Sequence, residues 1–138
     1  MAKLMVFGDT CTGVIGRYSR VLSNAPETDF HIRLFLPIGY TSPRDSAFVV
    51  QSINDLAGAG FDPSLVMFIL RPELWKPNPP DLCMDLYLID GPLEREGLLA
   101  IAKLLPKEKV SINHPHLGLR ELVHELGYQT NVALDSLL

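Results

Sequence analysis

The stretch that decides the predicted fold is KLMVFGDTCTGVIGRYSRVL, residues 3–22. Residues 3–7 are a short apolar run that ends at Gly8, which predicts a buried strand. From Val14 onward apolar residues recur at helical spacing, so we expect a helix directly after the loop 8–13, capped by Thr12. A strand that turns through small residues into a helix is typical of α/β proteins.

The rest of the chain repeats this alternation. We expect strands at 29–36, 65–70, 82–89, 109–112 and 129–134, and helices from Ser42-Pro43 to Gly58, over about 93–105 and over 117–126. The alternating pattern of 29–36 favours a strand at a sheet edge or a half-covered strand over a central one, whereas the wholly apolar 65–70 favours a strand covered on both faces. We therefore predict one three-layer α/β domain over residues 1–138, Rossmann-like or flavodoxin-like, with a mainly parallel sheet of five or six strands.

Composition excludes several classes of protein. The formal net charge is −4 and basic residues do not cluster, which argues against nucleic-acid binding. No apolar run approaches the roughly 18 residues that a membrane span needs. The two cysteines, Cys11 and Cys83, are too few for a disulfide framework, so a reducing, cytoplasmic location is expected.

The first loop is the leading candidate for a binding site. Ligands of parallel α/β sheets bind beyond the carboxyl ends of the strands, so we look to loops 8–13, 37–42, 71–81, 90–92 and 113–116. In the first loop Thr10 and Thr12 offer hydroxyl groups, Gly13 allows close approach, and a helix N-terminus favours an anion. This predicts a phosphorylated small molecule at Thr10, Thr12 and Gly13. The alternative is a purely structural connection, and Asp9 would repel an anion.

Residues 1–17 resemble the opening of flavodoxin-like proteins, whose first strand leads into a hydroxyl-rich loop that wraps the phosphate of FMN. Thr10, Thr12 and Gly13 match that loop, while Ile15 replaces the third hydroxyl residue. Residues 65–75 (LVMFILRPELW) are similar to the strand, proline and tryptophan that follow in the family, with Glu73-Leu74 intervening. The resemblance implies FMN as a cofactor, with Trp75 against its ring.

The possible catalytic motifs lack the further residues that their chemistry needs. Gly8-Asp9-Thr10 is similar to the GDS block of SGNH hydrolases, but no late Asp-x-x-His follows, and no histidine near residues 8–17 supports a nucleotidyltransferase. Asp9 and Asp90 would hold Mg²⁺ together or act in acid–base chemistry if their strands are neighbours, and the alternative is that both are ordinary turn residues. The remaining candidates are His114, His116 and His124 for zinc, and His116 alone as a general base. No complete catalytic set emerges, so we lean against an enzyme.

The proline-rich stretch 71–81 (RPELWKPNPPD) supports a second kind of function. Its four prolines exclude an ordinary strand or helix. Trp75 either packs back onto the domain or anchors a protein partner, including a second copy of the chain. The alternative function is therefore a non-catalytic interaction or assembly protein without a small-molecule ligand.

Overall fold

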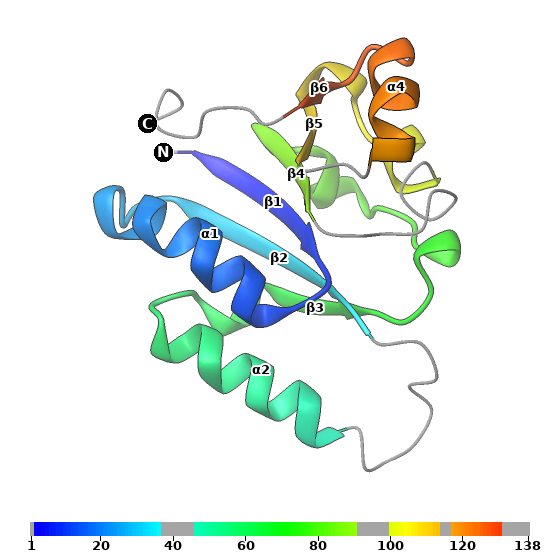
Figure 1. Ribbon diagram of the computed structural model, residues 1–138. Helices are drawn as coiled ribbons and strands as arrows, with labels where there is room; N and C mark the ends of the chain where they lie inside the picture. The colour runs from blue at the N-terminus through cyan, green and yellow to red at the C-terminus, as the bar shows by residue number, and fades with distance from the viewer. Residues whose placement is uncertain (1, 37–45, 91–99, 114–116, 131–138) are drawn as a thin grey trace.

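The computed structural model describes residues 2–36, 46–90, 100–113 and 117–130, and its centre is a six-stranded sheet (Figure 1). All strand pairs are parallel, so the predicted α/β class is confirmed. The strands are β1 (Lys3–Gly8), β2 (Asp29–Phe35), β3 (Val66–Ile69), β4 (Leu86–Asp90), β5 (Val110–Asn113) and β6 (Gln129–Thr130).

The strand order is β3-β2-β1-β4-β5-β6. The chain builds outward from β1 in one direction and then returns to build outward in the other, so the order reverses between β1 and β4. This is the doubly wound order of Rossmann-type folds, whereas flavodoxin has the order 2-1-3-4-5. At such a reversal the loops after the two neighbouring strands run to opposite sides of the sheet. The crevice beyond the carboxyl ends of β1 and β4 is therefore the expected ligand site.

Helices cover both faces of the sheet. Helices α1 (Cys11–Asn24) and α2 (Ser46–Gly58) lie side by side over β1, β2 and β3, while α4 (Leu117–Glu125) lies beside β5 and β6 (Figure 1). The α1 face buries alternate strand residues such as Leu4, Val6 and Ile32, and the opposite face buries Met5 and Phe7. None of the helices in the described ranges is long and apolar enough to cross a membrane.

Two strand environments differ from the prediction. The 29–36 strand was expected at an edge or half-covered, but β2 lies between β1 and β3. There its charged Arg33 is accommodated by burial against Asp81 of the 71–85 segment. The 65–70 strand was expected to be covered on both faces, but β3 is an edge strand whose Met67 side chain is 53% exposed. Apolar composition alone therefore does not identify the central strand.

The segment 71–85 connects β3 to β4 without a long helix. It contains two short 3-10 turns, η3 (Pro72–Leu74) and η4 (Pro79–Leu82), as four prolines in 71–81 require. The strand expected from residue 82 begins only at Leu86, because Asp85 instead bonds the start of β1. Its N–H donates to the Lys3 carbonyl at 2.8 Å, and its carboxylate accepts from the Lys3 N–H at 2.7 Å.

Some expectations fall outside the described residues. These are the helix start at Ser42-Pro43, the greater part of the 93–105 helix, His114 and His116, and the end of the 129–134 strand.

Candidate functional site

The loop after β1 turns directly into α1 at the point where the strand order reverses. Thr10 has an extended backbone and its side-chain oxygen accepts a hydrogen bond from the Gly13 N–H at 3.1 Å, so Thr10 is the N-cap. The expected cap, Thr12, is instead the second residue of the helix and is exposed. Either threonine suits a cap by type, but only Thr10 lies three residues before a donor it can reach.

Gly13 is required by this cap. A Cβ atom built on Gly13 would lie 2.9 Å from the Thr10 hydroxyl oxygen, closer than real Cβ contacts. The Gly13 N–H is used by the cap, whereas the N–H groups of Cys11 and Thr12 in the first turn have no acceptor within the helix. The Thr10 hydroxyl accepts from Gly13 and can still donate its own hydrogen. The donors that face outward are therefore those of Thr10, Cys11 and Thr12.

Arg17 brings a positive charge to the same end of α1. Its guanidinium lies 3.9 Å from the position of a Cβ atom on Gly13, so it lies beside the first turn. It also lies 3.9 Å from the Asp90 carboxylate at the end of β4, and its side chain is 40% exposed. A guanidinium has five N–H donors, so this long ion pair leaves donors for an anion.

A buried polar cluster lies under Arg17 on the α1 face of the sheet. Tyr18 donates a hydrogen bond to the Asp90 carboxylate, and both residues are 1% exposed. Asn113 pairs with Asp90 in the β4–β5 register and accepts from the Ser111 hydroxyl at 2.9 Å. Burial and, secondly, the Asp90 charge raise the pKa of Tyr18 well above its usual range, so the phenol stays a protonated donor.

The Mg²⁺ hypothesis required Asp9 and Asp90 to follow neighbouring strands. The strands β1 and β4 are neighbours, and Asp90 is buried against Tyr18 and Arg17. In the described part of the chain no three His, Cys, Asp or Glu side chains come together as a metal site. For Asp90 the structure shows a hydrogen bond from Tyr18 and an ion pair with Arg17.

Trp75 packs back onto the domain. Its ring meets that of Phe7 edge to face, with the centroids 5.2 Å apart, and the residue is half-buried. Phe7 belongs to the face of the sheet opposite α1. Trp75 thus lies near the carboxyl end of β1 but on the other face from Tyr18.

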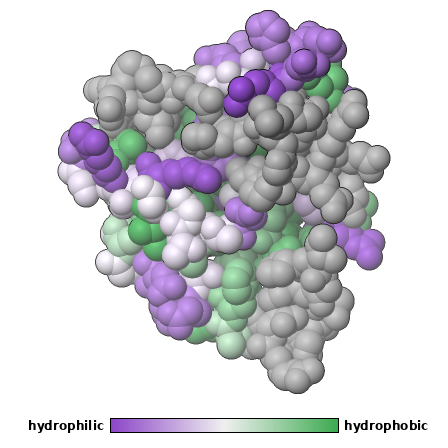
Figure 2. Space-filling view, viewed as in Figure 1, coloured by the Kyte–Doolittle hydropathy of each residue, from purple (hydrophilic) through white to green (hydrophobic). Residues whose placement is uncertain are grey.

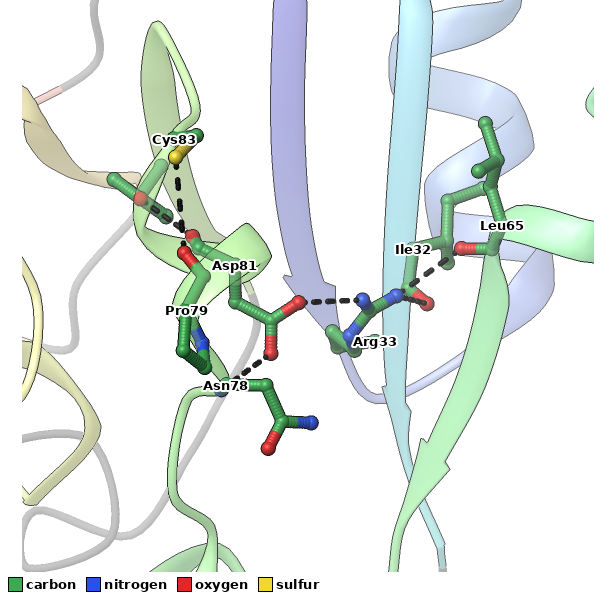
Figure 3. A network of polar contacts seen from close by, with 8 residues as sticks. Ile32, Arg33, Leu65, Asn78, Pro79, Asp81 and Cys83 are labelled. Atoms are coloured by element: carbon green, nitrogen blue, oxygen red, sulfur yellow. Dashed lines mark hydrogen bonds and ion pairs between the residues drawn. The ribbon is translucent and has the colours of Figure 1, made fainter.

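A second polar network fastens the 71–85 segment across that opposite face (Figure 3). The Arg33 guanidinium donates to the Asp81 carboxylate at 3.3 Å and to the carbonyls of Ile32 and Leu65 at 3.1 Å each. The Asp81 carboxylate also accepts from the Asn78 N–H at 2.9 Å. The Arg33 side chain is only 5% exposed, so its donors serve the protein itself.

The described histidines lie away from the carboxyl edge. His31 is within β2 beside Arg33, where burial first and the Arg33 charge second lower its pKa. His124 is exposed on α4, as its position off the apolar stripe indicated. Neither is placed to act at the first loop.

The end of β2 bears on the class of ligand. Dinucleotide-binding Rossmann domains place an acidic residue there to bond a ribose hydroxyl. In this chain the strand ends with Phe35 and continues to Leu36 within the described residues. As far as residue 36, the carboxyl end of β2 therefore carries no carboxylate of the kind that bonds a ribose in those domains.

Sequence reasoning missed Arg17, Tyr18 and Asn113. Tyr18 was expected only as part of the apolar stripe of the first helix, and no role was predicted for Arg17 or Asn113. The usable signal was the pair of polar residues, Asp90 and Asn113, that end two consecutive predicted strands, since such ends meet at one edge.

Comparisons with known proteins add no relative. The chain matches no sequence profile of a protein family, and no curated protein matches it.

Proposed function

We propose that this chain binds a phosphorylated small molecule of nucleotide type at the carboxyl edge of its sheet. The phosphate would accept hydrogen bonds from the first-turn N–H groups of Cys11 and Thr12 and from the threonine hydroxyls. The observation that carries the proposal is that α1 begins at the reversal of strand order between β1 and β4. FMN is the first ligand to test, with Trp75 toward its ring.

Arg17 supports the same proposal by charge. Its half-exposed guanidinium beside the first turn would offset the repulsion that Asp9 exerts on a dianion. The absence of an acidic residue at Phe35-Leu36 favours a mononucleotide or a simple phosphate ester over a dinucleotide. A cytoplasmic location fits this class of ligand and the free thiols of Cys11 and Cys83.

A thermal-shift screen with FMN, nucleoside phosphates and inorganic phosphate tests the proposal. A ligand at a hundredfold its Kd stabilises the folded chain by about 2.7 kcal/mol, a shift of several degrees. Thr12→Val should reduce the shift, because it removes an exposed hydroxyl that takes no part in the cap. Thr130→Val, the same change on exposed β6, is the matched control.

Gly13→Val is a poor test, because its side chain would displace the cap. A screen without any stabilising ligand contradicts the proposal, and so does a shift that Thr12→Val and Thr130→Val reduce equally.

The second candidate function is a non-catalytic interaction protein without a ligand. It is supported by the exposed apolar side chains of Met67, Leu70 and Leu74, which are 53%, 55% and 64% exposed along and after β3. A chain that binds no phosphate ligand but associates through this surface would fit this function.

A further inference from the structure

The two edges of the sheet are unlike each other. The β6 edge is Gln129–Thr130, two exposed polar residues. The β3 edge is Val66–Ile69, four residues without a charge or a proline, in the order VMFI. Natural edge strands normally carry a lysine, a proline or a bulge that prevents pairing with another chain, and β3 carries none of the three side-chain or backbone devices within these residues.

The outer edge of β3 offers backbone groups for pairing. The Ile69 carbonyl accepts from the Leu36 N–H at 2.9 Å, so residue 69 faces β2. Because N–H and C=O groups alternate in direction along a strand, Phe68 and Leu70 face outward. No strand of the described residues pairs with this outer edge, so it can accept one more strand.

Exposed apolar side chains accompany this edge. Met67 and Leu70 are more than half exposed on opposite faces of the strand, and Val50 of the neighbouring α2 is 56% exposed. On the face seen in Figure 2, hydrophilic surface gathers over α4 at the top of the view, whereas the surface over α2, lower down, mixes apolar and hydrophilic residues. The exposed side chains of Met67, Leu70 and Val50 thus place apolar surface at the β3 side of the sheet.

We propose that the β3 edge binds a second copy of this chain, forming a two-fold dimer with β3 strands paired antiparallel. In a symmetric pair centred on Phe68 the two Phe68 residues exchange N–H and C=O bonds, and the Leu70 N–H of each copy donates to the Val66 carbonyl of the other. The Val66 N–H is already bonded to the Pro63 carbonyl and takes no part. Leu70 of each copy then lies opposite Val66 of the other, and Met67 opposite Ile69. Within residues 66–70 apolar side chains therefore meet only apolar side chains.

The charges that flank β3 select this antiparallel partner. Arg71 follows the strand and is exposed, while Ser64 before the strand donates its N–H and hydroxyl to the Asp62 carboxylate at 2.9 and 2.7 Å. Those bonds hold the pKa of Asp62 below its usual value, so the carboxylate is charged. Antiparallel pairing brings Arg71 of each copy beside the Ser64–Asp62 turn of the other. The two-fold symmetry repeats this contact, so each copy places its Arg71 beside the acidic turn of the other, as an isologous interface requires.

The test is the molar mass of the full chain by sedimentation equilibrium across a dilution series. Wild type should reach twice the 15.3 kDa of one chain. Met67→Lys adds a charge to an exposed edge position and should raise the dimer Kd about tenfold or more. Leu82→Lys, at a leucine on η4 that is 41% exposed against 53% for Met67, is the control and should leave the Kd unchanged.

Amide hydrogen exchange locates the contact within the wild-type chain. Exchange at the Phe68 and Leu70 amides should slow as concentration rises, while exchange at Thr130 on β6 should not. A chain that stays monomeric overturns the proposal. A dimer that Leu82→Lys weakens and Met67→Lys does not would instead use the proline-rich segment, which also overturns it.

Discussion

The two buried polar networks of this protein use similar residues to different ends. On one face Arg33 holds Asp81 at 3.3 Å and bonds two carbonyls, with its side chain 5% exposed. On the other face Arg17 lies 3.9 Å from Asp90 with its side chain 40% exposed. The N–H donors of Arg33 are buried and bond the protein itself, whereas Arg17 has donors that reach solvent beside the N-terminus of α1.

This difference separates a structural network from a candidate site. The Arg33 network fastens the 71–85 segment, which replaces a crossover helix between β3 and β4. The Asp90 cluster lies at the carboxyl edge where parallel α/β sheets bind ligands. A buried charge alone does not indicate function, whereas a half-exposed charge held by a buried one at this edge makes the first turn of α1 a candidate site.

The largest expected effect is the loss of the Arg33 network. Arg33→Met leaves the Asp81 carboxylate without its guanidinium and should lower the free energy of unfolding by about 3 kcal/mol. Arg20→Met on the exposed side of α1 is the control and should change it by less than about 0.5 kcal/mol. Urea unfolding measures both, and equal effects would mean that the network does not fasten the segment.

Asp90→Asn should affect stability and binding in opposite directions. It weakens a buried hydrogen bond from Tyr18 and should lower the free energy of unfolding by about 2 kcal/mol. It also frees Arg17, so phosphate affinity measured by calorimetry should rise about fivefold. Asp81→Asn should destabilise the fold without changing phosphate affinity. If both variants bind phosphate alike, Arg17 has no role in the site.

Thr10→Ala removes the cap of α1 and should lower the free energy of unfolding by about 1 kcal/mol. Thr12→Ala should change it by less than about 0.5 kcal/mol, because Thr12 is exposed within the first turn. Thermal unfolding of the two variants compares them directly. If Thr12→Ala lowered the free energy of unfolding more than Thr10→Ala, Thr12 would be the cap, as the sequence indicated.

The smallest expected effect is a pH dependence at His31. Its pKa is lowered in the fold, so the unfolded chain binds the proton more readily. The stability contributed by neutral His31 is complete above its unfolded pKa of about 6.5 and is lost as the pH falls below it. His31→Gln should flatten the stability profile in that window. A profile unchanged by the substitution would show that Arg33 and burial do not act on His31.

The alternation of strands and helices was predictable from the sequence, while the positions of the strands within the sheet were not. Residues 3–22 predicted β1, the loop and α1, because a strand followed by a helical stripe is a local pattern. The sequence predicted an edge or half-covered position for β2 and a covered position for β3, and the structure shows β3 at the edge. The charge of Arg33 counted against a central β2, but its carboxylate partner lies 48 residues away in the sequence. No local pattern records such a partner.

The candidate site was chosen by its position, and the structure changes which residues compose it. The loop 8–13 was chosen because ligands of parallel sheets bind beyond the carboxyl ends of the strands. The cap, however, is Thr10, and the charge comes from Arg17, whose orientation depends on Asp90 across the sheet. Tyr18 shows the same limit, because its ring belongs to the apolar core and its hydroxyl to the polar cluster.

The most direct test of the central claim is an NMR titration of the labelled chain with inorganic phosphate and then FMN. We predict saturable shifts that are largest at the Cys11 and Thr12 amides and at the Arg17 guanidinium, with Arg33 unchanged. Saturable shifts confined to other residues, equal shifts at Arg17 and Arg33, or no shift with either ligand would contradict a phosphate site at the start of α1.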